Sequence, residues 1–220
     1  MVLRNRLVAV LIRILLAVFY IYPLNGYLSE FPSYGVALST FSVLLGIVLI
    51  VVTVLEIIFN LIDLRHGVHG VPAGPYMPIA LPVYAFSVLS GILYFAAQIP
   101  VGSAPFSTFG VFFHVMMIVG PLIDWIALDE KGTVRFAAGF TSQLYPILYF
   151  IFGYFRTLIW DESPIYGTHM YAYAFLDFTN PNIVWNAILF FAMTLGIVSL
   201  TIFSNNLFAG KYGLIRQRAD

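Results

Sequence analysis

Residues 43–55 read VLLGIVLIVVTVL, a stretch that is almost wholly apolar. It lies inside a predicted helix over residues 36–60, long enough to cross a hydrocarbon core that needs about 20 apolar residues at roughly 1.5 Å each. A spanning helix satisfies its own backbone hydrogen bonds, whereas the strands of a membrane barrel would alternate polar and apolar residues. The stretch therefore favours a transmembrane helix.

Other runs along the chain have the same character, and 61% of the 220 residues are hydrophobic while only 9% are charged. A soluble globule would have too little polar surface with this balance. We predict an all-α integral membrane protein, a single domain over residues 1–220 formed by a bundle of about six transmembrane helices. The first run contains Arg13 and lacks a small-residue cleavage site, so we expect a retained helix and not a signal peptide. The predicted helices cover residues 7–25, 36–60, 77–99, 107–127, 135–158 and 183–207.

Basic residues gather on one side of this topology. With six crossings, both termini and the loops near Arg65 and Lys131 share one face, and that face holds all the basic residues but Arg156. Loops rich in Lys and Arg stay in the cytoplasm. We therefore expect cytoplasmic termini and a location in the cell membrane, or in an endomembrane if the source is eukaryotic. The residues of this face are Arg4, Arg6, Arg13, Arg65, Lys131, Arg135, Lys211, Arg216 and Arg218.

Composition argues against several other classes of function. The formal charge is zero, so no attraction to nucleic acid is expected, and the absence of cysteine excludes thiolate chemistry. His66 and His69 form an H-x-x-H pair in a glycine-rich loop, a pattern too short to indicate a metal site. We expect no cofactor and no metal. The expected partners are membrane lipids and a small amphipathic substrate such as a lipid ester.

Polar residues form stripes on three of the predicted helices. Most of them are small or hydroxylated residues of the kind that join helices to one another in membranes. An ionisable side chain inside a span is different, because its burial in lipid is costly and usually serves a function. The stripes consist of Ser39, Ser42, Gly46, Thr53, Glu56 and Asn60 on the second helix, Ser107, Gly110, His114 and Pro121 on the fourth, and Ser142, Tyr145, Tyr149 and Arg156 on the fifth.

His114 is the histidine predicted to lie within a span, and Ser39 and Thr40 start the second helix on the same outer side of the membrane. A hydroxyl beside an imidazole indicates nucleophilic acyl transfer, because the imidazole takes the hydroxyl proton during attack. Arg156 ends the fifth helix on that side. It is a candidate for binding an anionic group or an oxyanion, or for a salt bridge with Asp161 or Asp177. We therefore predict an outer-leaflet cavity.

Four separated motifs, in order, resemble the androgen-induced and androgen-dependent multipass membrane proteins of animals and their bacterial six-helix relatives. The resemblance covers roughly residues 34–205. The motifs are LSTFSVLL at 38–45, His114 followed by Asp124-Trp125 and LDEKG at 128–132, Tyr145-Pro146 with Tyr149 and Arg156, and YAYAFLD at 171–177.

Animal members of that family are threonine hydrolases of fatty-acid esters of hydroxy fatty acids, so the resemblance implies this chemistry here. It places the histidine at His114 and the threonine at Thr40, with Val43 where the family has asparagine. A register shifted by one gives Ser39 instead, and helical spacing also favours Ser39, which shares the polar stripe. The resemblance makes Arg156, Tyr145, Tyr149, Tyr173 and Asp177 the candidate substrate-binding residues.

Asp124 and Asp129 lie at the inner end of the fourth helix, too far along the axis to orient His114, and we assign them a structural role. The leading hypothesis is an intramembrane lipid ester hydrolase with a Thr or Ser nucleophile and a His base. The alternatives are a transporter or lipid-binding protein without catalysis, and a structural membrane subunit.

The charge asymmetry yields a direct test of topology. In this cysteine-free chain, single cysteines can be introduced at Gly132, predicted to be cytoplasmic, and at Ser163, predicted to be external. An impermeant thiol reagent applied to intact cells should label the cysteine at 163 and spare the one at 132. The reverse pattern would show that the orientation is wrong.

Overall fold

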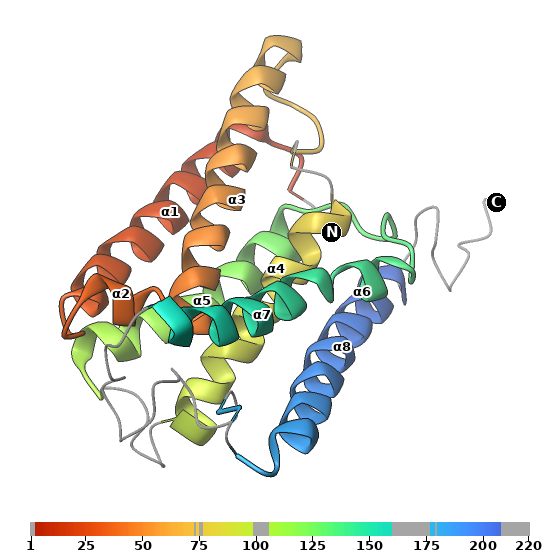
Figure 1. The fold of residues 1–220 in the computed structure, drawn as a ribbon. Helices are drawn as coiled ribbons and strands as arrows, with labels where there is room; N and C mark the ends of the chain where they lie inside the picture. Colours follow the sequence, from red (N-terminus) through yellow and green to blue (C-terminus); the bar gives the residue numbers. More distant parts are fainter. Residues whose placement is uncertain are drawn as a thin grey trace.

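The computed structural model describes residues 3–72, 74, 77–98, 106–159, 177–178 and 180–207. All of its regular elements in this part of the chain are helical, as predicted (Figure 1). Among the described residues, five helices are long and apolar enough to cross a membrane, and they cover Arg6–Leu28, Phe41–His66, Met77–Ala96, Thr108–Ala127 and Ile183–Leu207. The elements are α1 (Arg6–Leu28), α2 (Tyr34–Ala37), α3 (Phe41–Asp63), η1 (Leu64–His66), α4 (Met77–Leu93), η2 (Tyr94–Gln98), α5 (Thr108–Ala127), α6 (Ala138–Thr141), α7 (Leu144–Ile159) and α8 (Ile183–Leu207).

Two of the six predicted helices are interrupted. The segment 36–60 divides at Thr40, whose backbone is extended (φ −85°, ψ 137°) and which is the N-cap of α3. The segment 135–158 divides into α6 and α7, and α7 has 16 residues. Pro146 has no N–H to donate to the carbonyl of Ser142, which explains a fresh helix start here. In the view of Figure 1, α7 runs across the direction of α3 and α8.

The bundle exposes large apolar side chains and buries charged ones, unlike a soluble protein. On α1 the apolar Leu11 and Leu15 are 58% and 54% exposed, while Arg13 between them is fully buried. The same contrast holds on α3, where Val51 is exposed and Glu56 is buried. Lipid is the solvent that suits such a surface, and polar residues then face the bundle interior.

Helix contacts set the positions of the buried groups. α1 packs against α3 and α5, and α4 packs against α3, α5 and α8. Glycines allow close approaches between helices: a Cβ built on Gly46 of α3 would lie 2.5 Å from the ring of Phe113, and one on Gly91 of α4 would lie 2.7 Å from the backbone oxygen of His114. Small residues at such points let membrane helices approach backbone to backbone.

The contact at Gly91 generates a prediction of stability. Gly91→Ala should destabilise the detergent-solubilised protein by about 1–3 kcal/mol, because the added methyl group meets a backbone oxygen that cannot rotate away. Gly196→Ala is the matched control, since a Cβ at Gly196 has no atom within 4 Å. Thermal unfolding should show a lower melting temperature for the first variant only; equal melting temperatures would contradict the packing of α4 on α5.

Candidate functional site

His114 is fully buried in the second turn of α5. Its Nδ1 lies 2.7 Å from the carbonyl oxygen of Gly110. A carbonyl only accepts hydrogen bonds, so Nδ1 carries the hydrogen and the neutral ring has its lone pair on Nε2. Within the described residues, that Nε2 has no hydrogen-bond partner. The local fold therefore leaves His114 with a buried proton acceptor that is not in use.

Aromatic rings fix the plane of this imidazole. Tyr94 of η2 stacks on it with ring centres 3.7 Å apart and planes 2° apart. Tyr27 of α1 and the adjacent Phe113 meet it edge-on at 5.3 and 5.0 Å. Tyr94 belongs to a π-helical turn, a form that is frequent at functional sites. We call these four residues the His114 site.

The two candidate nucleophiles lie at the break between α2 and α3. The hydroxyl of Ser39 donates to the carbonyl of Gly35 at 2.6 Å, and that of Thr40 donates to the carbonyl of Ala37 at 2.8 Å. Because the chain is not helical at Thr40, the helical spacing that favoured Ser39 over Thr40 does not apply across this point. Ser39 is buried and Thr40 is half-buried.

Neither hydroxyl is hydrogen-bonded to His114 in the part of the chain that the structure describes. The two regions are connected through packing instead, because Phe113, next to His114, lies against Gly46 of α3. Two of the tyrosines predicted to bind substrate do contact the break between α2 and α3. Tyr149 donates its hydroxyl to the carbonyl of Ser39 at 2.8 Å, and both Tyr145 and Tyr149 pack against Phe41, with ring centres 5.4 and 5.0 Å away.

Two other predicted binding residues are also buried. Arg156 lies in the last turn of α7 and is 2% exposed, and Asp177 precedes α8 and is 5% exposed. Tyr173 and the neighbouring Tyr171 lie outside the described residues. The assignment of these residues to substrate binding stays a prediction.

A second polar site, which we call the Arg13 cluster, lies where α1 begins. It consists of Arg13 of α1, Glu56 of α3, Asp124 of α5 and Asp129 just beyond α5. The Arg13 guanidinium donates from Nη2 to Asp124 at 2.8 Å and to Asp129 at 3.0 Å, and its Nε lies 3.4 Å from Glu56. All four side chains are at least nine-tenths buried. Tyr84 of α4 donates its hydroxyl to Glu56.

Sequence reasoning gave Asp124 and Asp129 a structural role but did not bring them together with Arg13 and Glu56. The sequence did contain a signal for this cluster, namely the distance of each charged residue from the end of its helix. Arg13 and Glu56 each lie about 10 Å, at roughly 1.5 Å per residue, from helix ends on the same side of the bundle, and Asp124 lies one turn from such an end. Oppositely charged residues that lie within about two turns of the same end of neighbouring helices are expected to meet.

Burial also shifts the pKa values of Asp129 and Lys131, which follow α5. Burial, together with the neighbouring Asp124 carboxylate, raises the pKa of Asp129 to about 7, and burial lowers the pKa of Lys131 to about 8. The Lys131 ammonium donates to the carbonyl of Trp125 and lies 4.4 Å from the centre of its ring. Both shifts favour the neutral form of the group, as expected for ionisable groups that are removed from water.

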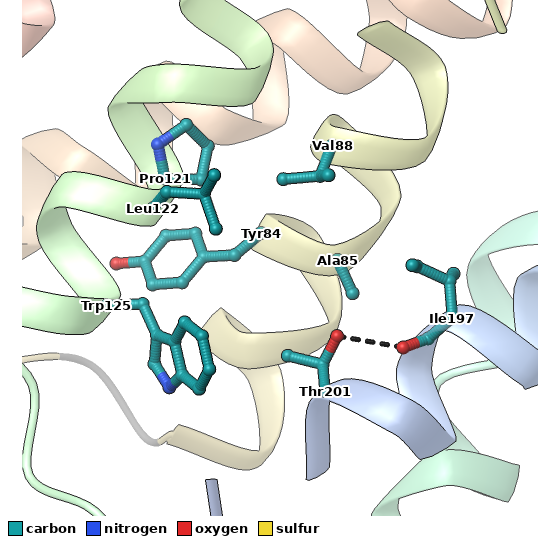
Figure 2. A pocket seen from close by; sticks show the side chains of 8 residues that line it. All are labelled: Tyr84, Ala85, Val88, Pro121, Leu122, Trp125, Ile197 and Thr201. Atoms are coloured by element: carbon teal, nitrogen blue, oxygen red, sulfur yellow. Dashed lines mark hydrogen bonds between the residues drawn. The ribbon is translucent and has the colours of Figure 1, made fainter. Parts of the chain in front are cut away.

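An apolar cavity of about 150 Å³ lies between α4, α5 and α8 (Figure 2). Figure 2 shows the ring of Tyr84 reaching from α4 toward α5, with Leu122 and Trp125 on either side. Tyr84 thus presents its ring to this cavity and its hydroxyl to Glu56 of the Arg13 cluster. The remaining lining residues are Ala85, Val88, Pro121, Ile197 and Thr201.

The fold and these sites define an all-helical integral membrane protein with buried polar groups at two depths. Comparisons of the chain with protein-family models, with curated proteins and with solved structures give no match. The resemblance to the androgen-induced family therefore stays a prediction.

The Arg13 cluster generates a prediction of stability. Arg13→Met should destabilise the protein by about 3–5 kcal/mol, because it leaves three buried carboxylates without their common cation. Arg65→Met removes an exposed cation and should change stability by no more than about 0.5 kcal/mol. Thermal unfolding in detergent compares the two; similar melting temperatures would show that the cluster does not hold the helices together.

Proposed function

We propose that this protein is an intramembrane hydrolase of lipid esters, with His114 as general base and Thr40, or Ser39 as the alternate, as nucleophile. The observation that carries the proposal is the lone pair on His114 Nε2, which accepts no hydrogen bond from the described residues and lies in a buried, aromatic setting. A general base needs an acceptor atom, and the hydrogen bond from Nδ1 to Gly110 leaves Nε2 in that form.

The reaction proceeds in two acyl transfers. The hydroxyl oxygen attacks the ester carbonyl carbon while Nε2 takes its proton, and the tetrahedral intermediate collapses as Nε2 returns that proton to the leaving alkoxide. A water molecule then repeats the sequence on the acyl-enzyme, which releases the fatty acid and restores the hydroxyl. For the attack, Thr40 must exchange its hydrogen bond to the Ala37 carbonyl for one to His114.

The membrane setting and one apolar cavity support this substrate class. A lipid ester reaches a buried site sideways between helices, and the apolar cavity between α4, α5 and α8 offers room for part of an acyl chain. Arg156 is proposed to hold the polar end or the oxyanion, with Tyr145, Tyr149, Tyr173 and Asp177 as further substrate-binding residues. The proposal includes a sixth crossing formed by α6 and α7 and cytoplasmic termini in the cell membrane.

The rival function is that of a transporter or lipid-binding protein without catalysis. The Arg13 cluster favours it, because ionisable groups inside a membrane bundle commonly mark ion or solute pathways.

The two functions differ in reactivity: a hydrolase reacts with a fluorophosphonate probe at its nucleophile, and a transporter does not. Labelling of purified wild-type protein, Thr40→Ala and Ser39→Ala distinguishes the functions and identifies the nucleophile.

The base has its own test. His114→Gln should lower ester turnover by about 10² to 10⁴, since glutamine can still donate to the Gly110 carbonyl but cannot accept a proton at neutral pH. His69→Gln, a histidine exposed in a loop, should keep full turnover. Melting temperatures measured alongside separate loss of chemistry from loss of fold. Turnover within a few-fold of wild type in a folded His114→Gln protein would show that the mechanism is wrong.

A further inference from the structure

The Arg13 cluster holds more negative charge than positive charge. Glu56, Asp124 and Asp129 supply three carboxylates, and Arg13 supplies one guanidinium. The nearby Lys131 forms no ion pair within 4 Å of these carboxylates in the described ranges, because its ammonium is directed to Trp125. Buried carboxylates in proteins are paired with cations or coordinate metals. One guanidinium is too few here.

Two carboxylate oxygens of the cluster are not satisfied. Arg13 binds the Oδ1 atoms of Asp124 and Asp129. Oδ2 of Asp129 and Oε2 of Glu56 are buried and have no hydrogen-bond partner among the residues described, apart from the 3.4 Å ion pair between Glu56 Oε2 and Arg13 Nε. These side chains are 4% and 0% exposed, so bulk water does not solvate them. Their oxygens can accept a further cation.

The spacing of the carboxylates fits such a cation. Glu56, Asp124 and Asp129 each offer one oxygen, and these oxygens all lie within 4.8 Å of one another. Ca²⁺ binds oxygens at about 2.3–2.6 Å, so ligands on its opposite sides are separated by about 4.6–5.2 Å. The donors are all oxygens, which favours Mg²⁺, Ca²⁺ or Mn²⁺ over ions that prefer imidazole or thiolate.

A route to the cluster also exists. A cavity of about 210 Å³ has a mixed lining, formed by the polar Asp129, Glu130 and Thr133 and by Val71, Pro72, Gly74, Met77 and Pro78. Gly74 lines this cavity and also lies beside the Arg13 cluster. A Cβ built on Gly74 would lie 3.9 Å from oxygens of Asp129 and Glu56 and 4.0 Å from Arg13 Nη2. The cavity therefore reaches the carboxylates from the loop that precedes α4.

We propose that Glu56, Asp124 and Asp129 bind one hard divalent cation, which enters through the cavity beside Gly74 and shares the three carboxylates with Arg13. The ion joins α3 and α5 at the end opposite to the His114 site, where it completes the charge balance that Arg13 begins. This site is independent of the proposed hydrolysis, so ion binding and ester turnover are measured separately.

Terbium luminescence tests the proposal directly. Tb³⁺ replaces Ca²⁺ at oxygen sites, and Tyr84, bonded to Glu56, and Trp125, one residue from Asp124, are close enough to sensitise its emission. Purified protein in detergent is first treated with a chelator and then titrated with Tb³⁺ at mildly alkaline pH. The Tb³⁺ emission should saturate at one ion per chain. Excess Ca²⁺ or Mg²⁺ should reverse it, and the order of their competition identifies the preferred ion. The same ions should raise the melting temperature.

Variants locate the ion. Asp129→Asn should weaken ion affinity at least tenfold, and Asp63→Asn, a carboxylate outside the cluster that pairs with Arg6, should bind as wild type does. If Asp129→Asn does not fold, Gly74→Ala serves instead, because it keeps every charge and adds a methyl group at ordinary contact distance beside the carboxylates. Its affinity should fall several-fold.

Two results would overturn the proposal. One is wild-type protein that gives no sensitised Tb³⁺ emission and whose melting temperature does not change in Tb³⁺, Ca²⁺ or Mg²⁺. The other is a melting temperature that rises on acidification but ignores the ions, which would show that a proton shared among the carboxylates balances the charge.

Discussion

The burial of Arg13 is the constraint on which the arrangement of the helices depends. A guanidinium cannot be deprotonated, so inside a membrane bundle it must find acceptors, and it finds them on two other helices and on the loop after α5. This requirement fixes the rotation of α1, because only one face of the helix carries the charge. It also fixes the rotations of α3 and α5, whose carboxylates must face the same point.

The His114 site depends on that arrangement even though it lies elsewhere. Asp124 and His114 are ten residues apart on α5, about 15 Å at roughly 1.5 Å per residue. Because α5 is one continuous helix over both positions, the rotation that turns Asp124 toward Arg13 also sets the direction of His114. Tyr27 of α1 and Tyr94 of η2 then meet the imidazole from two sides. The charged end of the bundle thus orients the histidine at the other end.

Hydropathy was sufficient to predict five of the six expected spans, whereas the predicted helix 135–158 divides into α6 and the 16-residue α7 and is not among the five candidate spans of the described residues. The last helix was predicted at its observed bounds of 183–207, and the fourth within one residue of α5. Averaged hydropathy could not locate the breaks at Thr40 and after Thr141, because they depend on single hydroxyl-to-carbonyl bonds and on one proline within apolar sequence. Hydropathy also could not predict which ring nitrogen of His114 keeps its lone pair. That depends on the hydrogen bond between Nδ1 and the Gly110 carbonyl, which leaves the lone pair on Nε2.

The Arg13 cluster escaped prediction for a different reason. Its members are separated by up to 116 positions in the chain, and which helices become neighbours is decided by packing and not by composition. Lipid tails solvate apolar side chains as well as a protein core does, so burying leucine gives membrane helices little preference for one neighbour over another. Close backbone contacts such as Gly91 on α5, and charges that only one arrangement can pair, supply that preference. The few charged residues of this apolar chain, together with glycines at close contacts, therefore specify which helices pack together.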